Sequence, residues 1–91
     1  MDLNKETRPA LARGVRLQTD PATGEPTLLF PEGVLHLSET AYEIVHLCDG
    51  RKSVEEIVKT LAAEYDENAA VLSEDVLDCL RDLYERKLVM F

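Results

Sequence analysis

The sequence is poor in aromatic residues and cysteine, and it contains no tryptophan. It also has no apolar run long enough to cross a bilayer, so we expect no membrane-spanning segment. Its first ten residues do not show the basic-then-apolar layout of a secretory signal, and we therefore expect a cytoplasmic protein. The two cysteines, Cys48 and Cys79, lack the paired spacing of a zinc site. In a reducing compartment they are most simply small buried hydrophobic residues.

Basic residues are also scarce. Ten Lys and Arg residues stand against 18 Asp and Glu residues, which gives a formal net charge of −8. Proteins that bind nucleic acid draw much of their affinity from basic side chains that neutralise phosphates. A chain this acidic is repelled by a phosphate backbone and by an anionic membrane surface. The composition therefore predicts a protein or peptide partner, with neither nucleic acid nor membrane as a target.

Sets of catalytic residues are missing as well. The two histidines, His36 and His46, are too few and too far apart in the sequence to indicate a metal centre. Neither of the glycine-rich phosphate-binding motifs occurs, and the zinc-protease motif H-E-x-x-H is absent. A chain of 91 residues makes a single domain, and most of its apolar residues are needed for one core. We therefore expect a binding protein spanning residues 1–91, with no catalytic residue, metal or cofactor.

The first half of the chain shows strand patterns. Apolar and polar residues alternate over residues 14–20, and short apolar stretches follow at 27–30 and 34–37. Turn-forming residues separate these segments at 20–25 and 31–33. The pattern predicts three short antiparallel strands. Residues 1–7 are polar and without periodicity, so we expect a flexible tail there.

The second half shows helix patterns. The first helix begins at Ser38 or Thr40 and is expected to end at residues 49–50, with Gly50 as a left-handed C-cap. Ser53 and Glu56 form a capping box at the start of the second helix, which continues to about residue 65. A third helix covers about 70–86, and residues 88–91 form an apolar extended end. The sequence therefore predicts an α+β, winged-helix-like fold, with a three-stranded antiparallel sheet followed by three helices.

Two other functions fit parts of this pattern. Successive helices beside a small sheet resemble a DNA-binding winged helix, although the second and third helices expose mainly acidic side chains. A small hydrolase or redox protein that uses Cys48 or Cys79 is the other alternative. Neither alternative accounts for the acidic composition as simply as a peptide-binding module does.

The third predicted strand is the most promising binding feature. It is short and apolar, and it contains no Lys or Pro that would block pairing with an added strand. An extended peptide can join such an edge, with main-chain hydrogen bonds for affinity and side-chain pockets for specificity. A neighbouring third helix would make the edge a groove. We expect the peptide-binding residues to be Val34, Leu35, His36, Leu37, Leu77, Leu80, Arg81 and Tyr84.

Some of these assignments leave alternatives open. Leu80 fits the groove and the core equally well. Arg81 can pair with a peptide carboxylate or with Asp78 or Glu85 on its own helix. The free strand edge can also pair with a second copy, so we expect a monomer or a weak homodimer.

Short segments along almost the whole chain resemble the PqqD family in order and spacing. No single segment is decisive, because each consists mainly of cap, turn and core residues, but their joint order is specific. The segments are RPAL at 8–11, RGVRLQ at 13–18, LL at 28–29, PEGV at 31–34, LSETA at 37–41, EIV at 43–45, CDG at 48–50, EIV at 56–58, DV at 75–76 and LV at 88–89.

The resemblance implies a chaperone-like protein of pyrroloquinoline quinone (PQQ) biosynthesis. Members of the family bind the precursor peptide PqqA and deliver it to PqqE, a radical S-adenosylmethionine enzyme that cross-links a Glu and a Tyr of the peptide. Their fold is the RiPP recognition element, which takes the peptide as an added strand beside the third strand and third helix. The chain departs from the family pattern where an aromatic residue is usual near Cys79 and a glycine near Lys87.

Overall fold

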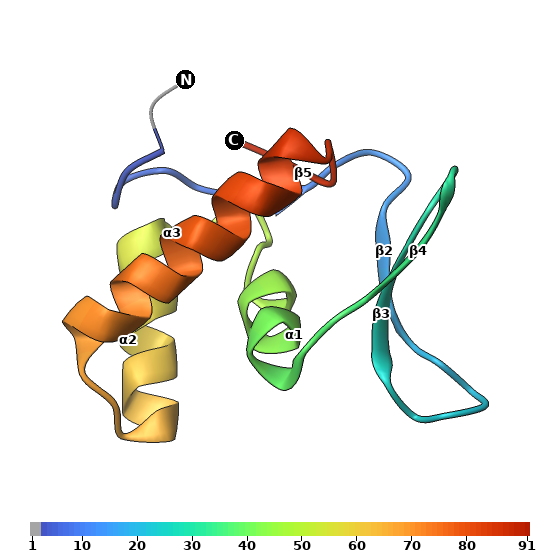
Figure 1. Cartoon of the computed structure of the whole chain (residues 1–91). Coiled ribbons are helices and arrows are strands. Elements are labelled where there is room, and N and C mark those ends of the chain that lie inside the picture. Colours follow the sequence, from blue (N-terminus) through green and yellow to red (C-terminus); the bar gives the residue numbers. More distant parts are fainter. Residues whose placement is uncertain (1–2) are drawn as a thin grey trace.

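The computed structural model describes residues 3–91, and the predicted α+β fold is confirmed (Figure 1). A three-stranded antiparallel sheet precedes three helices, and a small two-stranded sheet joins the two ends of the described chain. In chain order the elements are β1 (Ala10–Leu11), β2 (Arg16–Thr19), β3 (Pro26–Phe30), β4 (Gly33–His36), α1 (Glu39–His46), α2 (Val54–Tyr65), α3 (Ala69–Glu85) and β5 (Val89–Met90).

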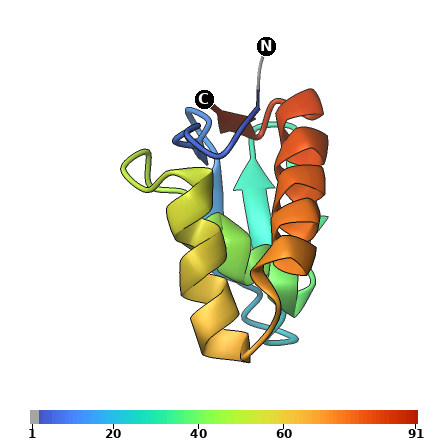
Figure 2. The same cartoon turned by 90° about the vertical axis from the view of Figure 1, so that its left-hand side faces the viewer.

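The larger sheet has the strand order β2-β3-β4, so β3 is central and β4 is an edge strand. Leu28 of β3 lies opposite Leu17 of β2 and Leu35 of β4, and its side chain is completely buried. All three leucines pack into one apolar cluster because opposed residues in neighbouring strands face the same side of a sheet. The helices cover this face, and Figure 2 shows β3 behind the gap between α2 and α3.

The small sheet of β1 and β5 was not predicted from the sequence. Ala10 pairs with Met90, and Leu11 pairs with Val89. The amide of Ala12 extends the pairing by donating to the carbonyl of Leu88, 2.9 Å away. Strands of two residues show no alternation, so the sequence pattern carries no signal for them. The pairing fixes the apolar end of the chain against the core, where Leu88 and Val89 are buried.

Both predicted helix starts are confirmed. The hydroxyl of Ser38 accepts a hydrogen bond from the amide of Ala41 at the start of α1. At the start of α2, Ser53 and Glu56 form the predicted capping box, each side chain accepting from the other residue's amide. Such caps satisfy amides that have no partner within the helix.

The predicted end of α1 is wrong. The helix ends at His46 with Leu47 as its C-cap, rather than at residues 49–50. Gly50 does have a left-handed φ of 79°, but its amide donates to the carbonyl of Pro9 at 2.9 Å. Asp49 forms a bridge with Ala10, so this segment pairs with the start of β1 and leaves the helical path.

The end of α3 is a Schellman motif, in which two amides beyond the helix bond back to its last carbonyls. The amide of Lys87 donates to Tyr84 and the amide of Leu88 donates to Leu83, both over 2.9 Å. Lys87 has a φ of 64°, a conformation that glycine adopts at less cost. Leu83 and Leu88 are both buried in the cluster beneath the sheet, so the motif turns the chain directly into β5.

The core has two parts. One cluster joins α1, α2 and the first half of α3, and the other joins the larger sheet, β5 and the end of α3. Cys48 lies in the first cluster, and Cys79 packs against both. Burial, together with the neighbouring Cys79, raises the pKa of the Cys48 thiol to about 12. Burial likewise raises the pKa of Cys79 to about 11, so both side chains are neutral apolar residues at physiological pH.

The segment before β1 is attached to α2. The amide of Val54 donates to the carbonyl of Thr7 at 2.8 Å, and the amide of Glu55 donates to Lys5 at 3.0 Å. Leu3 packs against the helical cluster. Residues 1 and 2 of the tail predicted to be flexible lie outside the described residues, and residues 3–7 contact the domain in this structure.

Replacing Lys87 with glycine should stabilise the protein. The substitution removes the steric cost of a side chain at a left-handed φ, and we expect the free energy of unfolding to rise by about 1 kcal/mol. Urea unfolding followed by circular dichroism measures this change. The matched control is Arg86→Gly, because Arg86 has a right-handed φ of −83° and should lose stability. Equal destabilisation by both variants would contradict the assignment.

The two thiols should resist alkylation in the folded protein. Their raised pKa values leave almost no thiolate at pH 8, so iodoacetamide should label them only after unfolding. Since the pKa of each thiol is higher in the folded chain, the associated stability is complete below pH 9 and is lost as pH rises from 9 toward 12. Mass spectrometry checks the first statement and unfolding midpoints the second. Rapid labelling of the folded protein would show that at least one thiol is accessible.

Candidate functional site

The open edge of the larger sheet is formed by β4. The amide of Leu37 donates to the carbonyl of Pro26 at 3.0 Å, which marks that pair as hydrogen-bonded. Bonded and non-bonded pairs alternate along an antiparallel ladder, so Leu35 and Gly33 also direct their backbone groups toward β3. Val34 and His36 therefore direct their N–H and C=O groups away from the sheet.

The side chains of this strand divide between the two faces of the sheet. Leu35 and Leu37 are half-buried and pack against the cluster beneath the sheet. Val34 is 52% exposed, and His36 is exposed with its Nδ1 3.8 Å from a carboxylate oxygen of Glu25. The four predicted edge residues thus lie together, with apolar side chains on one face and accessible backbone groups at the edge.

The end of α3 lies beside the turn between β3 and β4. Arg86 and Lys87 line one hollow together with Phe30, Pro31 and Glu32. Cys79 packs in the same cluster as the β4 leucines. Residues 79, 82 and 86 share one side of a helix because they are three and four positions apart. Cys79, Asp82 and Arg86 therefore lie on the side of α3 that runs from the cluster beneath the sheet to the hollow at the turn between β3 and β4.

The predicted groove residues of α3 occupy other positions. Leu80 is completely buried and packs in the helical cluster of the core. Leu77 packs against the cluster that includes α2. Arg81 is exposed and pairs with Asp78, their charged atoms 3.2 Å apart, which is one of the two pairings considered for it.

The side chain of Tyr84 packs against the C-terminal residue of the chain. Its ring stacks on that of Phe91 at a centroid distance of 4.7 Å, and it lines a hollow together with Ala12 and Met90. Tyr84 and Arg86 are two positions apart, so they point in directions about 200° apart around the helix. Cys79, Asp82 and Arg86 thus lie on a different side of α3 from Tyr84. Their spacing was visible in the sequence, but the side of α3 that faces the sheet was not.

Charged residues near the edge form local pairs. Arg86 contacts Asp82 at 3.1 Å, and both side chains are more than half exposed. Exposed pairs of this kind add little stability, so both groups remain available to a ligand at small cost. In the turn between α1 and α2, a hydrogen bond from the amide of Arg51 and further bonds from Lys52 hold the pKa of Asp49 well below its usual range. That carboxylate stabilises a turn.

Within residues 3–91, no group of three or more His, Cys, Asp and Glu side chains is arranged to hold a metal ion. His46 stacks on Tyr42 at a centroid distance of 5.9 Å, and His36 lies at the sheet edge, so the two histidines do not meet. Among the described residues, no helix has the length and apolar character needed to cross a membrane.

Comparisons with known proteins agree with this geometry. Residues 27–89 match the family model described as coenzyme PQQ synthesis protein D (PqqD). A protein of Xanthomonas axonopodis pv. citri named PqqA binding protein is 38% identical over 87 residues, covering 96% of this chain and 95% of that protein. A protein of the same name from Xanthomonas oryzae pv. oryzae (strain PXO99A) is also 38% identical, with the same coverage.

Solved structures show the same arrangement. The solution structure of the PqqD part of Methylobacterium extorquens PqqCD, described as a functional, stand-alone RiPP recognition element, superposes with a TM-score of 0.86 at 31% identity. That match covers 99% of this chain and 96% of the other. The crystal structure of PqqD from Xanthomonas campestris gives a TM-score of 0.63 at 36% identity, covering 99% and 100% of the two chains. The chain described here therefore belongs to the PqqD family.

Proposed function

We propose that this chain is a peptide chaperone of PQQ biosynthesis, which binds the precursor peptide PqqA as an added strand on β4 and presents it to the radical S-adenosylmethionine enzyme PqqE. The observation that carries the proposal is the open edge of β4, where Val34 and His36 direct their backbone groups away from β3. The name PqqA binding protein, given to relatives 38% identical to this chain, supports the choice of peptide. Those names describe binding, in agreement with a protein that is not an enzyme.

The strand edge offers a defined set of contacts. Val34 and His36 together provide two donors and two acceptors to an incoming strand, at the spacing of an antiparallel or parallel ladder. Each such hydrogen bond contributes about 1 kcal/mol net, so the backbone alone gives modest affinity. Side-chain contacts must add to it, and alternate residues of an added strand point to the same face.

On the helix side, the added strand would meet the flank of α3. We propose that Cys79 supplies apolar contact there and that the Asp82–Arg86 pair supplies charge to polar side chains of the peptide. The predicted contributions of Leu77, Arg81 and Tyr84 remain predictions. A direct contact with Leu80 would require the core to open, because its side chain is completely buried.

Two further expectations belong to this proposal. A cytoplasmic location is the first. A monomer or weak homodimer is expected because β2 forms a second free edge of the same sheet.

The proposal predicts that Val34→Pro weakens peptide binding without unfolding the protein. Proline lacks the outward N–H of residue 34, and edge strands tolerate it where that group faces solvent. Loss of one main-chain hydrogen bond should raise the Kd for PqqA about fivefold. Isothermal titration calorimetry with PqqA measures the change.

Two matched variants separate the backbone from the side chain. Val34→Ala keeps the amide and should bind PqqA with nearly normal affinity. Leu35→Pro removes an amide that faces β3 and should destabilise the fold itself. If folded Val34→Pro bound PqqA as tightly as the unmodified protein, strand addition at this edge would be refuted.

A further inference from the structure

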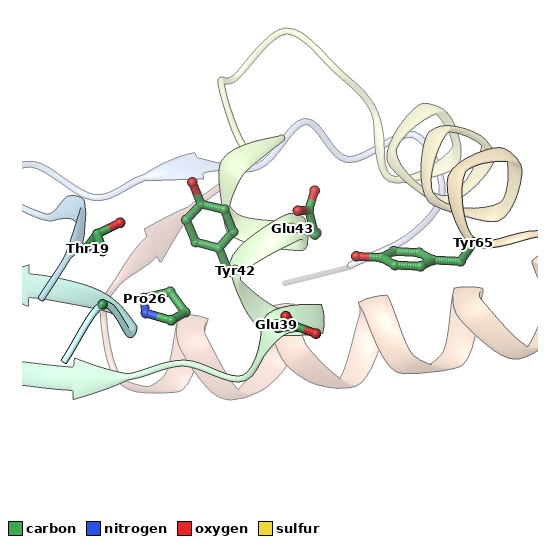
Figure 3. A pocket seen from close by; sticks show the side chains of 7 residues that line it. Thr19, Pro26, Glu39, Tyr42, Glu43 and Tyr65 are labelled. Carbon is green, nitrogen blue, oxygen red and sulfur yellow. The ribbon is translucent and has the colours of Figure 1, made fainter.

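A third hollow lies on another part of the surface, between the start of α1, the end of α2 and the loop joining β2 to β3 (Figure 3). Its volume is about 410 Å³. No residue of β4 or α3 lines it, so it is separate from the proposed peptide edge. The lining residues are Thr19, Gly24, Pro26, Glu39, Tyr42, Glu43 and Tyr65.

Two tyrosine rings form part of its walls. Tyr65 is 43% exposed, so part of its ring is open to a ligand. Figure 3 shows its hydroxyl reaching from α2 toward the carboxylates of α1. Tyr42 is held by stacking on His46, with an angle of 10° between the ring planes. The hollow therefore presents aromatic surface supported by two helices.

The same hollow is negatively charged. Glu39 and Glu43 lie one helical turn apart on α1, and no Lys or Arg lines the hollow. Within the described part of the chain, neither glutamate takes part in an ion pair, whereas four other acidic residues are paired with Lys or Arg. Partial desolvation, and then the charges of Glu43, Glu64 and Glu39, raise the pKa of Tyr65. Carboxylates and aromatic rings converge here with no cation between them.

We propose that this hollow binds an arginine or lysine side chain of a partner protein. A cation placed against a tyrosine ring is attracted by the negative face of the ring, and two unpaired carboxylates strengthen that attraction. The strongly acidic chain also attracts a basic partner over longer distances, since its formal net charge is −8. Resting on the proposed function, we assign the partner as the enzyme that receives the peptide.

This assignment gives the protein two binding surfaces, one for the peptide and one for the enzyme. The peptide would occupy the edge of β4, while the enzyme would hold the α1–α2 side by a basic side chain. Because the two surfaces share no residue, both partners can bind at once. Simultaneous binding is what presentation of a peptide to an enzyme requires.

The test is a comparison of enzyme binding among three forms of the full chain. The double variant Glu39→Gln/Glu43→Gln should raise the Kd for the enzyme PqqE about tenfold and weaken its dependence on salt. The control Glu6→Gln/Glu74→Gln makes the same change in net charge at two exposed positions outside the hollow and should bind the enzyme nearly normally. Biolayer interferometry at two salt concentrations measures both.

A second variant, Tyr65→Ala, removes the ring without changing charge and should also weaken enzyme binding several-fold. In all of these variants the Kd for PqqA should stay unchanged, since the β4 edge is intact. Equal enzyme binding by the unmodified protein, the double glutamate variant and Tyr65→Ala would overturn the inference while leaving the proposed function standing. Failure of the unmodified protein to bind the enzyme would refute both presentation and this inference, and failure to bind PqqA would instead refute peptide capture.

Discussion

The register between β3 and β4 determines what the sheet edge can offer. Leu28 opposite Leu35 and the bond from Leu37 to Pro26 set that register. A slip of one residue would turn the half-buried leucines to solvent and would exchange the inward and outward backbone groups. The burial of Leu28 against the helices therefore maintains the accessibility of Val34 and His36. Core packing and the open edge of the sheet are consequences of the same pairing.

The end of α3 connects this edge to the rest of the fold. The Schellman motif at Lys87 turns the chain into β5, and β5 pairs with β1. This closure places the last turn of α3 beside the turn between β3 and β4. Arg86 consequently lies beside that turn, next to its ion-pair partner Asp82. The positive φ at Lys87 favours glycine, and the chain tolerates a lysine there at some cost in stability.

Local signals made much of this structure predictable, and non-local contacts account for the rest. Alternation, turn residues and the caps at Ser38 and Ser53 identified the sheet and the helix starts, because their causes lie within a few residues. The pairing of β1 with β5 and the bridge from Asp49 to Ala10 join distant segments, so no local pattern predicts them. For the same reason the predicted α1 was too long.

The candidate site likewise has one part that the sequence predicted and one part that it did not. The edge strand was located by its own short apolar pattern, and the structure puts it at the edge of the sheet. The side of α3 that faces it depends on how the helix is rotated against α2 and the sheet. A wide apolar stripe leaves that rotation open, which is why Leu77 and Leu80 were expected in the groove although they pack toward the core.

Hydrogen exchange at individual amides tests strand addition most directly. With saturating PqqA, the account predicts that the amides of Val34 and His36 become strongly protected, because they gain partners in the added strand. The amide of Leu35 already bonds to β3 and should change much less. Unchanged exchange at both Val34 and His36 in the presence of bound peptide would contradict the account.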